Sequence, residues 1–356
     1  MVKPAGFRVL STLAIAFIAL ASPLRAQFAY VANYTDNTLS GYSIASNGAL
    51  TPVAGSPYPA GFQPKGMGVV QNKFVYVVTG DPVETIIGYS IASDGALSTI
   101  PGSPFPAAMG CSTLNVDPLG RFLFLPAGDA IYVYTIGSNG ALTAVAGSPF
   151  QGKGAYGLAI DPSGTFAFGL TGGHGEAQAI WEYQIESTGA LTLVTHYATA
   201  KHPSSLTVDP TGKFLYGTAY RCFTGYRITS KGALKGLTGF PMFHAGKGGF
   251  AIDPSGKFAY VPDPTPGINS ILAYRIGSTG ELRPVPKMPF GKAGWGETAI
   301  DPTGKFFYQV NGYVEKNDAP LGVSGYVIGA NGALTAIPGS PFAAGNLPYG
   351  IAITSQ

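Results

Sequence analysis

The chain has 356 residues, with 21 lysines and arginines against 18 aspartates and glutamates, which gives a formal net charge of +3. Charged residues form only 11% of the chain, against about a quarter in an average globular domain. Lys3, Arg8 and Arg25 account for the whole positive excess, so the chain beyond residue 26 is neutral. This balance excludes a nucleic-acid binder that relies on a basic surface.

Residues 1–26 are predicted to be a secretory signal peptide. They carry Lys3 and Arg8, then an apolar run from Val9 to Ala21, then small residues that permit cleavage after Ala21 or Ala26. The alternative is an uncleaved membrane anchor, but the run is shorter than the roughly 20 residues that a spanning helix needs. We therefore expect an exported chain, periplasmic or extracellular, with no membrane attachment after cleavage.

Residues 27–356 contain two recurring phrases. The first, "GAL" or "GEL", begins at seven glycines, namely Gly48, Gly95, Gly140, Gly189, Gly232, Gly280 and Gly332. The second, "DPxGKF" or a near form, ends at Phe122, Phe166, Phe214, Phe258 and Phe306, and Phe28 and Phe74 open the same kind of segment. Successive phenylalanines are 44 to 48 residues apart. Such a period is typical of a solenoid or a propeller.

Each unit contains four short strands rich in aromatic and β-branched residues. In one unit these are "YGLAI", "FAFGLT", "AIWEYQI" and "ALTLV", joined by "DPSGT", a loop and "ESTG". Seven four-stranded antiparallel units predict an all-β fold, a single seven-bladed β-propeller over residues 27–356. The chain begins with a second strand, "FAYVAN", and ends with a first strand, "YGIAI". The C-terminal strand is therefore predicted to complete the N-terminal blade and close the ring.

The repeats resemble the seven-bladed β-propeller lactonase family, which includes 6-phosphogluconolactonases and carboxymuconate-cyclising enzymes. The segments that carry the resemblance are "YVANYTDNTLSGYSI", "NGALTPVAGSPY" and "IDPSGKFAYV". It implies lactone chemistry without a bound cofactor, at loops that place a histidine and an arginine on neighbouring blades. An exported chain would not meet phosphorylated central metabolites, which makes a cytosolic sugar-phosphate substrate a poor fit.

Candidate site residues are those that remain after the repeat is subtracted. The aspartates of the "DPxG" turns, Asp161, Asp209, Asp253 and Asp301, allow a metal or acid function, but an Asx-turn explains them better. On the face opposite to these turns, His174 and Arg221 are expected in loops between second and third strands of neighbouring units. Glu297 precedes a first strand where other units have Gly157, Gly249, Gly350, Ser205 or Thr113.

Lactone hydrolysis needs a base to activate water and a cation near the developing oxyanion. We expect His174 or Glu297 to be the base, with Arg221 or a lysine as the cation. The predicted substrate-binding residues at the channel mouth are Lys65, Lys153, Lys201, Lys247, Lys292, His202, Tyr156, Trp295 and Tyr349. The lysines form either a ring that attracts an anionic small molecule or ordinary solvated surface.

Other chemistry is not indicated. The sequence lacks the HExxH, paired CxxC, EF-hand and GxSxG motifs, so we expect neither a metal nor a cofactor. Cys111 and Cys222 lie two units apart, which favours free thiols over a disulfide. We expect a monomer. The alternative function is a non-catalytic propeller that binds a ligand or a protein outside the cytoplasm.

Overall fold

Short runs of aromatic and β-branched residues form 32 strands in the computed structural model of the chain. The structure describes residues 26–80, 84–152, 157–171, 179–199, 203–219, 222–243, 248–265, 269–312 and 322–355. Within these ranges every regular element is a strand, and no helix is long and apolar enough to cross a membrane. The predicted leader lies outside the described residues, apart from Ala26.

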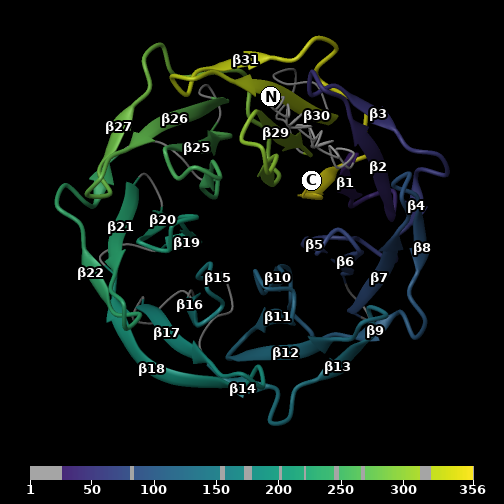
Figure 1. Ribbon diagram of the computed structural model, residues 1–356, viewed down its shortest axis with the longest axis horizontal. Coiled ribbons are helices and arrows are strands. Elements are labelled where there is room, and N and C mark those ends of the chain that lie inside the picture. The colour runs from purple at the N-terminus through teal and green to yellow at the C-terminus, as the bar shows by residue number, and fades with distance from the viewer. Residues whose placement is uncertain are drawn as a thin grey trace, which may run out of the picture.

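Seven antiparallel sheets stand around a central axis as the blades of a β-propeller, which confirms the predicted fold (Figure 1). Blades 1 to 3 comprise, from the inside outward, β32 (Pro348–Ile353), β1 (Gln27–Asn33), β2 (Thr38–Ile44) and β3 (Leu50–Pro52); β5 (Met67–Val70), β6 (Phe74–Val78), β7 (Thr85–Ile91) and β8 (Leu97–Thr99); and β10 (Asn115–Val116), β11 (Phe122–Ala127), β12 (Ala130–Ile136) and β13 (Leu142–Ala144).

The remaining blades follow the same order. Blades 4 to 7 comprise β15 (Leu158–Ile160), β16 (Phe166–Leu170), β17 (Ala179–Ile185) and β18 (Leu191–Ala198); β19 (Pro203–Val208), β20 (Phe214–Ala219), β21 (Cys222–Ile228) and β22 (Leu234–Gly236); β24 (Ala251–Ile252), β25 (Phe258–Asp263), β26 (Ser270–Ile276) and β27 (Leu282–Pro284); and β28 (Thr298–Ile300), β29 (Phe306–Asn311), β30 (Gly322–Ile328) and β31 (Leu334–Ala336).

Six blades also return to their third strand after the outer one. Four do so through the short strands β4 (Tyr58–Pro59), β9 (Phe105–Pro106), β14 (Phe150–Gln151) and β23 (Met242–Phe243). Blades 6 and 7 do so through single bridges, Ile271 to Phe290 and Val323 to Phe342. Blade 4 has no such return within its described residues, and its outer strand β18 is the longest of the seven.

The two ends of the described chain close the ring as predicted. β1 pairs with β2 on one side and with β32 on the other, with Ala29 opposite Ile353 and Val31 opposite Ile351. Phe28 and Thr354 add a reciprocal pair of hydrogen bonds, in which the Phe28 N–H donates to the threonine hydroxyl and the Thr354 N–H donates to the Phe28 carbonyl. In Figure 1 the yellow β32 lies beside the purple β1. The closure pairs β1 on both sides, so that it is not left as an open edge.

The repeated aspartates form Asx-turns, which confirms the structural interpretation of the "DPxG" phrase. In each turn one carboxylate oxygen accepts backbone N–H bonds from the fourth and fifth residues onward, as from Lys213 and Phe214 to Asp209. The other oxygen accepts the N–H and hydroxyl of the second residue onward, here Thr211. Asp161, Asp253 and Asp301 repeat the pattern.

The two repeated phrases meet where neighbouring blades pack. The "GAL" glycine of one blade lies against the phenylalanine that opens the second strand of the preceding blade, as Gly140 against Phe74 and Gly280 against Phe214. All seven glycines have φ between 83° and 92°. In five blades a tyrosine two residues after the phenylalanine donates its hydroxyl to the same glycine's carbonyl, as Tyr76 does to Gly140 at 2.6 Å.

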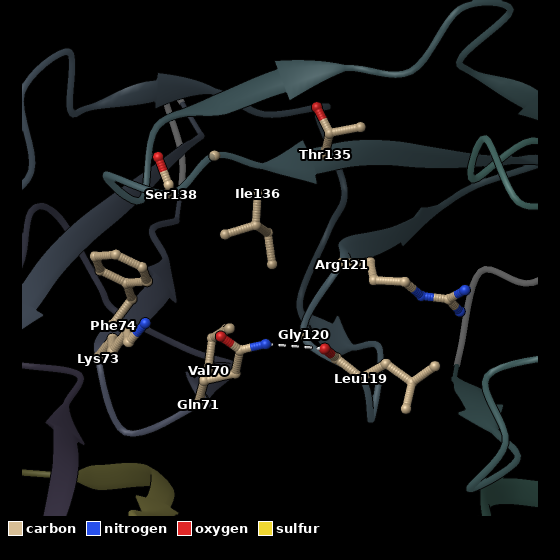
Figure 2. A pocket seen from close by; sticks show the side chains of 11 residues that line it. Val70, Gln71, Lys73, Phe74, Leu119, Gly120, Arg121, Thr135, Ile136 and Ser138 are labelled. Atoms are coloured by element: carbon tan, nitrogen blue, oxygen red, sulfur yellow. Dashed lines mark hydrogen bonds between the residues drawn. The ribbon is translucent and has the colours of Figure 1, made fainter.

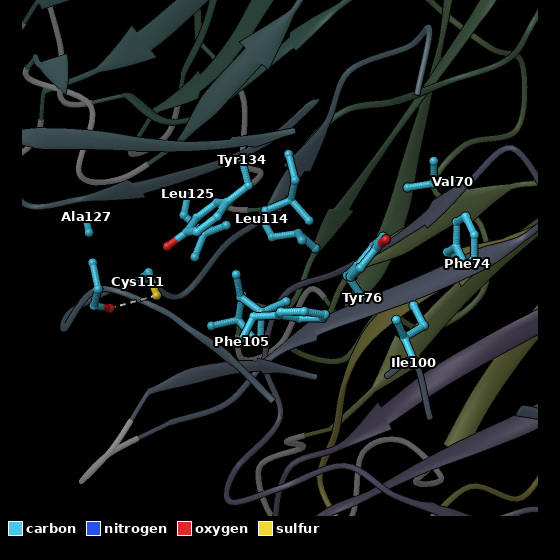
Figure 3. Packing of buried hydrophobic residues seen from close by; sticks show 14 residues of the cluster. Val70, Phe74, Tyr76, Ile100, Phe105, Cys111, Leu114, Leu125, Ala127 and Tyr134 are labelled. Atoms are coloured by element: carbon cyan, nitrogen blue, oxygen red, sulfur yellow. Dashed lines mark hydrogen bonds between the residues drawn. The ribbon is translucent and has the colours of Figure 1, made fainter. Parts of the chain in front are cut away.

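The hydrophobic core is accordingly divided into clusters between blades rather than gathered at one centre. The cluster between blades 2 and 3 contains Tyr76, Phe105, Leu125 and Tyr134, all buried, together with the thiol of Cys111 (Figure 3). Each blade therefore depends on both neighbours for the burial of its apolar residues.

We expect Gly140→Ala to lower the free energy of unfolding by about 1–3 kcal/mol. Its φ is +83°, and a Cβ would lie 2.6 Å from Ile100 Cδ1 and 2.8 Å from Phe74 Cδ1. Gly236→Ala is the matched control, because no atom lies within 4 Å of the Cβ position there. Urea unfolding followed by circular dichroism measures both. Equal midpoints for the two variants would contradict the interblade contact.

Candidate functional site

Glu297 lies just before β28, the innermost strand of blade 7. It lines a cavity of about 220 Å³ between blades 6 and 7, together with Gly249, Phe250, Pro262, Gly296 and Thr298. Glu297 is partly exposed, and its Oε2 accepts a hydrogen bond of 3.3 Å from the N–H of Ile351 on β32. The carboxyl group is thus held between the innermost strands of blades 7 and 1.

Burial raises the pKa of Glu297 to about 7, against the lowering effect of the hydrogen bond from Ile351. Protein atoms surround the carboxyl group on most sides, and they replace the water that would solvate its charged form. A carboxyl that titrates near neutral pH can hold or release a proton under ordinary conditions. This is the property expected of a general base or acid.

Gly350, which lies beside Glu297 in space, leaves room for the carboxyl group. A Cβ on Gly350 would lie 3.3 Å from Glu297 Oε2 and 2.6 Å from the backbone oxygen of Lys65. Glu297 and Lys65 therefore lie on the two sides of Gly350, just before the innermost strands of blades 7 and 2, which flank β32 of blade 1. This juxtaposition joins residues more than two hundred positions apart in the sequence.

Lys65 also takes part in a buried polar cluster. Its Nζ lies 3.9 Å from Oε1 of Glu84, whose side chain is only 2% exposed. Oε2 of Glu84 accepts hydrogen bonds from the Cys111 N–H at 3.0 Å and from its thiol at 3.3 Å. Lys65 thus already has an anionic partner, which weakens the field it can offer a ligand. Glu84 was missed by the sequence analysis because no motif marks it.

Two of the predicted aromatic residues lie exposed close to Glu297. Trp295 and Tyr349 are 43% and 41% exposed, and the backbone oxygen of Tyr349 accepts the Glu297 N–H at 2.8 Å. The Tyr349 ring lies 6.4 Å from the ring of Tyr34, whose hydroxyl donates to Gln63 at 2.7 Å. Burial, and then the charge of Glu297, raises the pKa of the Tyr349 hydroxyl. Tyr34 and Gln63 were not predicted, because no motif marks either of them.

The other predicted residues divide into two groups. Lys292 is exposed and lies on the same connection as Trp295 and Glu297, with its backbone N–H donating to the hydroxyl of Tyr326 at 3.3 Å. The remaining predictions fall on residues outside the described ranges, namely His174, Arg221, Lys153, Lys201, Lys247, His202 and Tyr156. Their functions stay predictions.

A larger cavity, about 530 Å³, lies on the opposite face, between the turns of blades 2 and 3 (Figure 2). None of the predicted site residues lines it. Gln71 bridges it through a 3.0 Å hydrogen bond to the Leu119 carbonyl. The guanidinium of Arg121 is committed to Asp117 and to the Gly164 carbonyl. Its size thus comes from a gap between turns rather than from converging functional groups.

Neither cysteine forms a disulfide, as predicted, and both are buried. Burial, followed by the hydrogen bond to Glu84, raises the pKa of the Cys111 thiol to about 12. A thiol of this kind is a poor nucleophile. Within the described ranges, no group of three or more histidine, cysteine, aspartate or glutamate side chains is placed to hold a metal ion.

Known proteins of the same shape were found by comparison of structures. A protein of Bacteroides uniformis named as a candidate 6-phosphogluconolactonase has a TM-score of 0.73 at 16% identity, with 93% of this chain and 100% of that chain covered. The periplasmic gluconolactonase PpgL of Pseudomonas aeruginosa has a TM-score of 0.70 at 16% identity, with 93% and 99% covered. A candidate 6-phosphogluconolactonase of Bacteroides fragilis gives 0.71 at 17%, with 92% and 98% covered.

We expect Glu297→Gln to stabilise the folded chain at alkaline pH. The ordinary glutamate pKa is 4.5 and the folded value is about 7, so the unfolded chain ionises first and the free energy of unfolding falls as pH rises between these values. The total loss is roughly 3 kcal/mol. Glutamine cannot ionise, so the variant should gain about that amount at pH 8 and little at pH 4.

Glu281→Gln is the control for this measurement. Glu281 is partly exposed and accepts a hydrogen bond from the Thr279 hydroxyl, which lowers its pKa. Its removal should therefore give no gain at alkaline pH. Thermal unfolding of both variants between about pH 4 and pH 8 measures the difference. A gain in stability that does not depend on pH would contradict its assignment to the ionisation of Glu297.

We also expect both thiols to be unreactive in the folded chain. Cys111 and Cys222 are fully buried, and a thiol-disulfide reagent needs an accessible thiolate. Titration with such a reagent should show no prompt reaction in buffer and full reaction of both thiols in denaturant. Rapid labelling of one thiol in buffer would contradict the burial.

Sequence comparison adds no assignment, because no family model and no curated protein matches the chain. The structural matches show a shared fold at low identity. They confirm, at the level of the fold, that this chain resembles the seven-bladed β-propeller lactonases.

Proposed function

We propose that the chain is an exported lactonase-type enzyme that hydrolyses, or in reverse forms, an acidic or sugar-derived lactone at the channel mouth. The observation that carries the proposal is Glu297, a carboxyl with a pKa of about 7 that lines a cavity beside the innermost strands. PpgL, which has the same fold, is a periplasmic gluconolactonase. That name supports lactone chemistry and export without fixing the substrate.

The cavity is compatible with this chemistry in size. Its volume of about 220 Å³ corresponds to roughly seven water molecules at bulk density, enough for a small ring and the attacking water. Phe250 and Pro262 give it apolar walls, which restrict solvent. Trp295 and Tyr349 offer exposed aromatic surface at the mouth.

In the proposed reaction the ionised Glu297 accepts a proton from water while the water oxygen attacks the lactone carbonyl carbon. The resulting oxyanion needs a nearby cation, and Arg221 or a lysine of the mouth is the candidate for this function. Collapse of the tetrahedral intermediate breaks the ring C–O bond. The proton from Glu297 then passes to the leaving alkoxide, which gives the open hydroxy acid. His174 is the alternative base.

A non-catalytic ligand-binding propeller is the second candidate. The observation that favours it is the pairing of Lys65 with Glu84, since a cation with a partner stabilises a developing oxyanion less than a free one. Under this hypothesis the mouth binds its ligand without turnover. Substitutions at Glu297 would then change affinity alone.

We expect Glu297→Gln to lower kcat for lactone hydrolysis by about 10²–10⁴-fold, which is the usual contribution of general acid–base catalysis. The assay would use residues 27–356 with a panel of neutral, carboxylated and phosphorylated lactones. Glu281 lies in a turn on the face opposite to Glu297, so Glu281→Gln should keep the wild-type rate. If Glu297→Gln, His174→Ala and Arg221→Ala all hydrolyse at the wild-type rate, the assignment of the site fails.

The wild-type pH profile is a second expectation. If ionised Glu297 is the base, kcat/KM should fall about tenfold per pH unit below pH 7 and level off above it, because the pKa of the group is about 7. A profile that is flat from pH 5 to pH 8 would exclude Glu297 as the base. Absence of turnover with every lactone in the panel would favour the binding propeller.

A further inference from the structure

The outer strand of blade 4 differs from those of the other blades. In six blades this strand is three residues long, and a proline follows it within a few residues, namely Pro57, Pro104, Pro149, Pro241, Pro289 and Pro341. In blade 4, β18 extends over eight residues, "LTLVTHYA", without a proline. It pairs with β17 from Leu191 to Ala198.

The other side of β18 carries no partner strand within the described part of the chain. β18 is the last strand in its sheet, and residues 192–196 are consecutively exposed. Since an antiparallel strand directs backbone groups alternately to its two sides, an edge of eight residues presents about four N–H and four C=O groups outward. Leu193 and Val194 add apolar surface, at 48% and 50% exposure.

This edge lacks most of the devices by which proteins block strand addition. Protected edge strands are usually short or carry lysine or proline. The strand "LTLVTHYA" is eight residues long, contains no lysine or proline, and has no aspartate, glutamate or arginine. One bulge occurs, at Val194, between the pairs Tyr183–Leu193 and Glu182–Thr195. Beyond it four residues continue in register, and His196 stacks on Trp181 with ring centroids 4.8 Å apart. The edge is therefore already ordered, which lowers the entropy cost of pairing.

We propose that β18 pairs antiparallel with β18 of a second copy of this chain, so that two copies of blade 4 form one eight-stranded sheet across a two-fold axis. The uncharged strand supports a second copy as the partner, because identical strands can pair there without like-charge repulsion. Among the residues that the structure describes, only blade 4 offers an outer edge strand of this length, so the assembly closes as a dimer and does not extend.

The position of the edge is compatible with the proposed function but independent of it. β18 is the outermost strand of blade 4 and lies on the rim of the ring (Figure 1), whereas Glu297 precedes β28, the innermost strand of blade 7. A dimer through β18 therefore leaves the mouth of each copy open. The expectation of a monomer stays a prediction, and the experiment below decides between it and the dimer.

The test is sedimentation velocity of residues 27–356 over about a hundredfold range of concentration. We expect the mass to rise to that of two chains. Val194→Lys, at a position already half exposed, would place two ammonium groups close together at the two-fold axis and should raise the dimer Kd at least about tenfold. Leu193→Lys is a second variant at the same edge, and circular dichroism verifies that both fold.

Thr51→Lys is the matched control. Thr51 is an exposed residue of β3, the outer strand of blade 1, where Pro57 follows. Its lysine should leave the dimer Kd unchanged. The proposal is overturned by a single-chain mass at every concentration, which would leave the edge to a strand of another protein. It is equally overturned by a dimer that Val194→Lys and Leu193→Lys do not weaken more than Thr51→Lys does.

Discussion

The packing of the seven blades rests on one repeated contact, in which a glycine of one blade lies against a phenylalanine of the preceding blade. Each "GAL" glycine holds a left-handed conformation with φ of 83° to 92°, and the aromatic ring occupies the space where a side chain would stand. A tyrosine hydroxyl fixes the same glycine's carbonyl in five blades. The "GAL" or "GEL" phrase and the phenylalanine recur in every unit because each interface needs one of each.

Ring closure extends this contact to the ends of the chain. Gly48 of blade 1 packs on Phe306 of blade 7, and β32 joins β1 in one sheet. The closing strand also carries Tyr349, Gly350 and Ile351 to the side of Glu297 and Lys65. The candidate site therefore exists only in the closed ring, and its stability is linked to the pairing of the two ends of the propeller.

Two departures from the repeat coincide with features that the regular residues do not explain. Glu297 stands where other units have small residues, and there burial raises the pKa of a carboxyl to about 7. Within the residues that the structure describes, blade 4 has no return to its third strand like that of the other six blades, and its outer edge has no partner strand there. The regular residues, by contrast, have structural explanations, as the Asx-turns of Asp161, Asp209, Asp253 and Asp301 show.

The fold, the closure of the ring and the irregular position of Glu297 could be predicted from the sequence. Turn chemistry, strand periodicity and repeat spacing are local properties, so consecutive residues are enough to show them. Only the tertiary structure decided that Lys65 pairs with Glu84 beside Cys111, that Tyr34 lies against Tyr349, and that Glu297 is buried enough to shift its pKa. These contacts join residues that are distant in the sequence, either through loops of one blade or between neighbouring blades. Their partners follow from how the loops and sheets pack, which no single repeat encodes.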